Sequence, residues 1–283
     1  MKLFLLFLLL NISILNATSL RIEAIDLFKT LDKYKVLDTR SKDLYLNGHI
    51  QGSLNFPVDE TYDNKMLNGK IVQPLKIQNK LRNLGLDVND HIVIHDDGTF
   101  FDASRLFWTL EVYGFKNIKL LSTGYKQWKR YGFQTSTLLP SITKSNYIAS
   151  VNNKRLATKF STQIAIKNPN YVILDARGIN AYNGKVSMAK RFGHIPKALY
   201  FPAHNNINDK GSLTKLKTEK SLKEVYSKIK KGTKVIVYCA IGRIATSNYF
   251  ALRELGFDVA NYDSSWREWG NDFNLPITNP SEK

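Results

Sequence analysis

The chain has 283 residues, of which 43% are hydrophobic and 12% aromatic. This composition excludes a disordered chain, and the length suffices for two domains with separate cores. The net charge of +17 would suit a nucleic-acid-binding protein, but the lysines are scattered rather than clustered in a stripe with exposed aromatic residues. We therefore expect no nucleic-acid partner, and a basic surface that at most favours small anions.

The first element of the chain is an apolar segment. In residues 1–19, Lys2 stands near the start, an apolar run follows over 3–10, and small residues that include Ala17 stand at the end. This order is typical of a cleaved secretory signal peptide, whereas a membrane-spanning helix needs about 20 apolar residues. We predict a periplasmic or secreted protein with no membrane association after signal cleavage. An uncleaved anchor is the alternative.

Four segments of the chain occur twice, in the same order. The matched pairs are 34–40 ("YKVLDTR") with 171–177 ("YVILDAR"), 48–57 with 193–202, 91–115 with 234–257, and 118–128 with 259–269. The repeat is far longer than the units of about 20 to 50 residues that build solenoids. We therefore predict two duplicated domains, at 20–133 and 158–283, joined by a linker at 134–157.

Each copy alternates short apolar runs with amphipathic stretches. In the second copy, "VILD", "ALYF" and "VIVYC" predict buried strands. The stretch 221–232 predicts a helix with Ser221 as its N-cap and a glycine at its end, and 245–257 predicts a helix that ends at Gly256. This alternation predicts an α/β fold, with a mostly parallel sheet flanked by helices in each domain.

The only cysteine of the chain, Cys239, follows the run "VIVY" and precedes a loop and a helix. Ligands of parallel sheets bind beyond the carboxyl ends of the strands, which is where this cysteine lies. The loop amides and the positive end of the helix can surround an anion, which favours the reactive thiolate. Gly242 allows a backbone angle forbidden to larger residues, and Arg243 adds a positive charge. The alternative is an inert, buried cysteine.

The first copy is an internal control for this interpretation. Alignment places Asp96 opposite Cys239, in a loop that carries a second carboxylate, Asp97, and that we expect to be one residue longer. An acidic loop lacks a thiol nucleophile and repels anions. We therefore predict that the second domain carries the chemistry and that the first is inactive.

A second difference is the longer segment between Arg177 and His194 in the second copy. Its additional residues include Lys185, Lys190 and Arg191. This cationic insertion beside the cysteine-bearing copy is either a lip that steers anions or a solvated surface loop.

These features together resemble a known family. The paired "LDAR" and "GHIP" segments, the Cys239 loop and "YDSSWREWG" at 262–270 resemble the tandem-domain rhodaneses, which are thiosulfate and 3-mercaptopyruvate sulfurtransferases. The resemblance covers nearly the whole chain after residue 19. It implies two rhodanese-like domains, the first inactive with aspartate in place of cysteine, and no cofactor or metal. It also implies that Cys239 takes sulfur from a small anionic donor, holds it as a persulfide, and passes it to a thiophilic acceptor.

The resemblance also indicates which residues bind the donor. Arg191 is similar to a family arginine that holds the donor's anionic group. Arg177 either contacts the donor or forms a structural pair with Asp175 at the strand end. His194 is expected to fix a turn, and Trp266 and Trp269 are expected in the core. The predicted donor site comprises Arg177, Arg191, Ala240, Ile241, Gly242, Arg243 and Ile244.

The loop departs from the family pattern in a way that leaves the donor open. Thiosulfate enzymes of the family tend to carry two basic residues after the cysteine and mercaptopyruvate enzymes carry small ones. Here Ala240 and Ile241 follow, and the cation comes later, at Arg243. We predict a thiosulfate sulfurtransferase, with 3-mercaptopyruvate as the alternative donor and a non-turnover sulfur carrier or binding module as a further alternative. A cysteine phosphatase is disfavoured, because Ala245 stands where an arginine would clamp phosphate.

Overall fold

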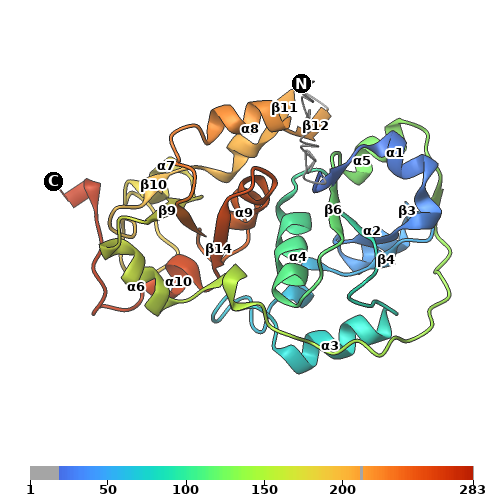
Figure 1. Ribbon diagram of the computed structural model, residues 1–283, viewed down its shortest axis with the longest axis horizontal. Coiled ribbons are helices and arrows are strands. Elements are labelled where there is room, and N and C mark those ends of the chain that lie inside the picture. The colour runs from blue at the N-terminus through green and yellow to red at the C-terminus, as the bar shows by residue number, and fades with distance from the viewer. Residues whose placement is uncertain (1–18, 211–212, 283) are drawn as a thin grey trace, which may run out of the picture.

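The computed structural model describes residues 19–210 and 213–282, which form two α/β units side by side (Figure 1). The first unit lies on the right in this view and the second on the left. The predicted signal peptide, 1–19, lies outside the described residues except for Ser19. Within the described ranges, no helix combines the length and the apolar character that crossing a membrane requires.

Each unit contains a five-stranded parallel sheet, and the two sheets share one strand order. The first sheet runs β1 (Arg21–Ile22), β6 (Ile118–Leu121), β5 (Ile92–His95), β2 (Lys35–Asp38), β4 (Leu54–Asn55). The second runs β8 (Leu156–Ala157), β14 (Asp258–Tyr262), β13 (Lys234–Tyr238), β9 (Tyr171–Asp175), β10 (Leu199–Tyr200). Two antiparallel pairs accompany them, β3 (His49–Ile50) with β7 (Thr135–Ser136) and β11 (Ile207–Lys210) with β12 (Leu213–Leu216). The predicted fold class is confirmed, and β5 and β13 are the central strands.

Helices flank both sheets. Those of the first unit are α1 (Ala24–Lys29), α2 (Lys42–Leu46), α3 (Pro74–Asn83), α4 (Phe101–Val112) and α5 (Tyr125–Arg130). Those of the second unit are α6 (Lys159–Lys167), α7 (Ile179–Tyr182), α8 (Glu219–Val225), α9 (Ala245–Glu254) and α10 (Ser265–Trp269). The helices α4 and α9 directly follow the central strands and lie side by side in the middle of the molecule (Figure 1).

One hydrophobic core extends across both units. It joins the inner face of each sheet, α4 and α9, while two smaller clusters fill the outer faces under α1 and α5 and under α6 and α10. At the contact between the central helices, the rings of Phe107 and Phe250 meet edge to face, with centroids 5.2 Å apart. The continuous core holds α4 against the loop that precedes α9, so the first unit helps to position that loop.

The predicted elements of the second unit form, with one correction. The three apolar runs are β9, β10 and β13, and α9 ends two residues before Gly256, which has a φ of 79°. The helix predicted over 221–232 instead begins at Glu219 and ends at Val225. Its N-cap is Thr218, whose hydroxyl accepts the amide of Ser221 at 3.2 Å, so the prediction of Ser221 as the cap was wrong.

The segment predicted as a linker, 134–157, has secondary structure at both ends. It starts with β7, which pairs with β3 of the first unit, and it ends with β8, the edge strand of the second sheet. Between these strands, Tyr147 is buried and its hydroxyl donates to the carbonyl of Tyr113 at 2.6 Å. The connection is therefore packed against the first unit.

Candidate active site

Cys239 lies one residue beyond β13, at the carboxyl end of the central strand, and is 1% exposed. Its amide donates to the hydroxyl of Ser265 at 3.1 Å, and its carbonyl accepts the amide of Trp266 at 3.0 Å. Ser265 adopts a φ of 53°, uncommon for a non-glycine residue, and its hydroxyl donates to the carbonyl of Tyr262 at 2.7 Å. The start of α10 thus fixes the peptides on both sides of the thiol.

The loop that follows, residues 239–244 and here called the Cys239 loop, has free amides and occupied carbonyls. Within the part of the chain that the structure describes, the amides of 240–244 donate to no acceptor. The carbonyls of Ala240, Gly242 and Arg243 accept hydrogen bonds. The helix α9 starts at Ala245, directly behind these amides, and has no acidic residue in its first turn. Free donors at a helix N-terminus make this loop suited to an anion, as predicted from the sequence.

The cation of the loop, Arg243, is paired with the first unit. Its Nε donates to Oδ1 of Asp102 on α4 at 2.5 Å, and this bond is the main cause of the raised pKa of Arg243. The side chain remains 35% exposed. Arg243 is therefore partly accessible, and Asp102 would compete with an anion for it.

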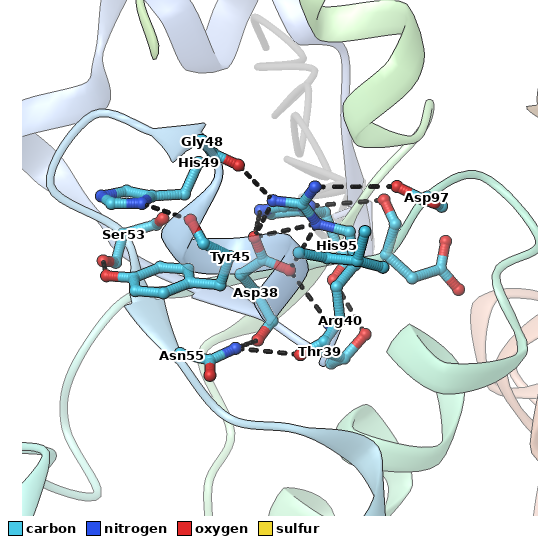
Figure 2. A network of polar contacts seen from close by, with 12 residues as sticks. Asp38, Thr39, Arg40, Tyr45, Gly48, His49, Ser53, Asn55, His95 and Asp97 are labelled. Carbon is cyan, nitrogen blue, oxygen red and sulfur yellow. Dashed lines mark hydrogen bonds and ion pairs between the residues drawn. The ribbon is translucent and has the colours of Figure 1, made fainter. Parts of the chain in front are cut away.

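Arg177, predicted as a possible donor-binding residue, is fixed within the scaffold. It is buried, with Nε and Nη2 at 2.9 and 2.6 Å from the two carboxylate oxygens of Asp175 and with Nη2 at 2.8 Å from the carbonyl of Gly193. Figure 2 shows the same arrangement in the first unit, where Arg40 pairs with Asp38. Because the unit without the cysteine keeps the same pair, the structural role predicted for Arg177 is present in both units, and its contact with a donor stays a prediction.

Arg191 does not reach the cysteine either. Its guanidinium donates to the carbonyls of Leu275 at 2.7 Å, Trp269 at 2.8 Å and Gly270 at 3.3 Å, and also to that of Asp272. These carbonyls lie at and beyond the carboxyl end of α10, whereas Cys239 contacts the start of this helix. The resemblance-based prediction that Arg191 binds the donor is therefore not supported, since all of these donors serve backbone carbonyls.

The histidine and tryptophans predicted as structural are so placed. Nδ1 of His194 lies 2.7 Å from the carbonyl of Tyr182, and the two rings stack 4.0 Å apart. Trp266 and Trp269 are fully buried in the outer core of the second sheet.

Residues of the first unit cover the Cys239 loop, and sequence reasoning missed them. A side-chain carbon placed on Gly69 would meet Ile241 at 3.0 Å, so the segment before α3 lies directly on the loop. Tyr62 is 2% exposed, and its hydroxyl has no hydrogen-bond partner in the described ranges. Burial raises the pKa of Tyr62 to about 12, with Arg105 acting against the rise and Cys239 adding to it. The cysteine is thus enclosed between the two units.

The corresponding loop of the first unit, residues 96–100 and here called the Asp96 loop, is occupied by its own carboxylate. Oδ1 of Asp96 accepts the amide of Gly98 at 2.7 Å, and Oδ2 accepts the amide of Ala103 at 3.4 Å and the hydroxyl of Thr99 at 3.3 Å. The carbonyl of Asp96 accepts the amide of Tyr125 at 2.8 Å, as that of Cys239 accepts Trp266. The two units share this contact, and the group at the centre of the loop differs.

The additional residue of the first copy lies in its helix. The chain is one residue longer from Asp96 to Gly114 than from Cys239 to Gly256, as expected, but α4 begins at Phe101 whereas α9 begins only at Ala245, so this residue extends the start of α4 rather than the loop. Asp96 binds the first turn of α4 directly through Ala103, which draws the helix toward the strand. No group of three His, Cys, Asp or Glu side chains in the described ranges could hold a metal ion.

Comparison with known proteins identifies the family of both units. A model of the rhodanese-like domain matches residues 23–131 and 160–272. A probable 3-mercaptopyruvate sulfurtransferase of Schizosaccharomyces pombe is 30% identical over 265 residues, which cover 87% of this chain and 88% of that protein. A putative thiosulfate sulfurtransferase of Saccharopolyspora erythraea is 29% identical and covers 84% and 88%. The crystal structure of SseA from Escherichia coli, a 3-mercaptopyruvate sulfotransferase by its description, matches with a TM-score of 0.78 at 25% identity, over 88% of this chain and 99% of that one. The chain therefore belongs to the rhodanese-like domain family, with two copies of the domain in tandem.

Proposed function

We propose that this protein is a sulfurtransferase in which Cys239 carries the sulfur. The thiolate attacks the outer sulfur of the donor and forms a Cys239 S–S bond, while the bond between that sulfur and the rest of the donor breaks. From 3-mercaptopyruvate the leaving group is the enolate of pyruvate, which takes up a proton. From thiosulfate it is sulfite. A thiophilic acceptor such as cyanide then removes the outer sulfur and returns the thiolate, so no oxidant or reductant is needed.

The free amides of the Cys239 loop are the observation that carries this proposal. A persulfide is an anion at neutral pH, and the amides of 240–244, which directly follow Cys239 in the chain, donate to no acceptor in the described ranges. In the first unit, the amides of Gly98 and of Ala103, the latter in the first turn of α4, already donate to the carboxylate of Asp96. Donors aimed at a developing negative charge in a buried site stabilise it far more than donors in water do.

Among donors, we propose 3-mercaptopyruvate first and thiosulfate second. The sequence alone favoured thiosulfate, but the names of the relatives favour the mercaptopyruvate alternative. The loop agrees with that order, because Ala240 and Ile241 are uncharged and Arg243 is already paired with Asp102. One partly available cation suits a single carboxylate better than the dianion of thiosulfate. Export of the mature chain from the cytoplasm remains a proposal that rests on residues 1–19.

The test is a steady-state assay of the purified chain with cyanide as acceptor and with each donor in turn. We expect thiocyanate to form with both donors, a higher kcat/KM for 3-mercaptopyruvate, and no turnover in Cys239→Ser. A higher kcat/KM for thiosulfate would reverse the order of donors. Stoichiometric sulfur uptake without turnover, with cyanide or with dithiols, would instead indicate a sulfur carrier.

A further inference from the structure

A buried arginine of the first unit contacts the Cys239 loop of the second. Arg105 lies on α4 and is 0% exposed. Its Nη1 donates to the carbonyl of Gly242 at 2.9 Å and to Oδ1 of Asp263 at 2.9 Å. On the other side, its Nε donates to the hydroxyl of Thr61 at 3.3 Å. The guanidinium therefore links the first unit to the loop after Cys239 and to the turn before α10.

The contact with Gly242 fixes the direction of a peptide in the loop. No cis peptide occurs among the described residues, and a trans peptide is planar, so its N–H points opposite to its C=O. The carbonyl of Gly242 is held on the outer side by Arg105 and by the side-chain amide of Asn261, at 3.2 Å. The amide of Arg243, on the same peptide, is consequently turned away from Arg105 and has no acceptor within the described ranges. Arg105 thus sets the orientation of one of the free donors.

The contact with Asp263 holds the second segment that meets at the cysteine. Asp263 is two residues before Ser265, whose hydroxyl accepts the amide of Cys239. Burial raises the pKa of Asp263, and Arg105 acts against this rise, as does the hydrogen bond from the amide of Ile71. Arg105 therefore favours the charged form of a carboxylate that has no lysine or arginine of its own unit among its hydrogen-bond partners in the described ranges.

We propose that Arg105 is a positioning residue for Cys239: the unit without a nucleophile supplies the guanidinium that aims the loop amides of the other unit at the sulfur. The consequence for turnover rests on the proposed function. The consequence for the thiol does not, because the reactivity of Cys239 toward an alkylating reagent requires no sulfur donor.

A second arginine contact between the two units provides a matched control. Arg253 on α9 pairs with Glu111 on α4, with Nη2 and Oε1 2.9 Å apart. This pair also joins the units through α4 and α9, yet none of its hydrogen bonds in the described ranges involves residues 239–244. Replacing Arg253 should weaken the interface without reorienting the Cys239 loop.

The experiment measures the rate of Cys239 alkylation by iodoacetamide as a function of pH, in the full chain and in Arg105→Met, Arg105→Lys and Arg253→Met. Melting temperatures and the values of kcat and KM are recorded for each variant. For Arg105→Met we expect the midpoint of the alkylation profile to rise by about one pH unit, the scale on which neighbouring groups shift a thiol. We expect kcat to fall about tenfold with a smaller change in KM. For Arg253→Met we expect a lower melting temperature and an unchanged profile.

The other outcomes separate positioning from alternatives. Arg105→Lys keeps the charge, but an ammonium lacks the planar group that lets Nη1 bind Gly242 and Asp263 while Nε binds Thr61, so we expect its profile to stay shifted. Full restoration by lysine, an unshifted profile in Arg105→Met, or an equal shift in Arg253→Met would overturn the proposal. If Arg105→Met does not fold, Asn261→Ala removes the other bond to the same carbonyl and should shift the profile in the same direction by less. A shifted profile in a chain that transfers no sulfur would refute the proposed function and leave this inference standing.

Discussion

At the end of β5 a side chain of the protein itself binds the backbone amides, whereas at the end of β13 the corresponding amides are free. Asp96 occupies the first site with a carboxylate that binds the amides of Gly98 and Ala103. Cys239 occupies the second with a thiol, and the amides after it have no acceptor in the described ranges. The same fold therefore forms two kinds of loop. With Asp96, backbone amides bind the chain's own carboxylate, whereas with Cys239 the amides stay free for a charged intermediate.

The largest effect is expected when the second loop is converted into the first. Cys239→Asp should abolish sulfur transfer, by at least about a thousandfold, because no nucleophile remains. It should not lower the melting temperature below that of Cys239→Ser, because the new carboxylate can accept the free amides. The assay is thiocyanate formation together with thermal unfolding. A melting temperature well below that of the serine variant would show that the amides of the Cys239 loop cannot bind a carboxylate as those near Asp96 do.

A smaller effect is expected from the glycines of the two loops. Gly242 has a φ of 68°, and a side-chain carbon there would lie 2.3 Å from the carbonyl oxygen of Asp263. Gly98 has a φ of 119°, and its closest neighbour would be 3.6 Å away. Gly242→Ala should lower the free energy of unfolding by about 2–4 kcal/mol and reduce kcat, whereas Gly98→Ala should cost about 1–2 kcal/mol and leave kcat unchanged. Denaturant unfolding and the transfer assay measure both; equal losses in the two variants would contradict the packing difference.

The arginines of the second unit should separate into donor binding and stability. Arg243→Met should raise the donor KM about tenfold, the size of one charge-assisted hydrogen bond. Asp102→Asn should lower this KM, because it releases Arg243.

Arg191→Met should leave KM unchanged and lower the free energy of unfolding by about 2 kcal/mol, since backbone carbonyls lose their donors. A raised KM in the Arg191 variant would restore it to the donor site.

The smallest effect concerns the pH dependence of the first loop. Burial raises the pKa of Asp96 above its ordinary value of 3.8. A carboxyl with a raised folded-state pKa stabilises the fold below its unfolded value, and this contribution is lost as pH rises through the folded value. Because asparagine does not titrate, the melting temperature of Asp96→Asn relative to the unchanged chain should increase from pH 4 to pH 7, with activity retained. A difference that shrinks over this range would contradict the direction of the shift.

Most of the correct predictions were based on the internal repeat. It assigned the central strands, placed Cys239 at a strand end, and identified Asp96 as its counterpart. The apolar runs and their spacing fix these features locally, through strand patterning and the positions of glycines. The pairing of Asp175 with Arg177 also followed from the sequence, because the two residues are neighbours and recur as Asp38 and Arg40.

The contacts between the two units could not be predicted from the same patterns. Asp102, Arg105 and Tyr62 act on the Cys239 loop from more than 130 positions away in the chain, and nothing local marks them. The available signal was the charge of Arg105 directly before the apolar run at 106–108, since a buried charge requires a partner. Arg191 was predicted as a donor ligand from the resemblance, whereas in the structure its guanidinium donates to backbone carbonyls at and after the end of α10, and its contact with a donor stays a prediction.

The most direct test of an open site at Cys239 is the intact mass of the protein after exposure to 3-mercaptopyruvate or thiosulfate, and again after cyanide. We expect a gain of one sulfur atom on the peptide that contains Cys239, its removal by cyanide, the same gain in Asp96→Asn, and no gain in Cys239→Asp. No added sulfur with either donor, or a gain that persists without Cys239, would contradict it.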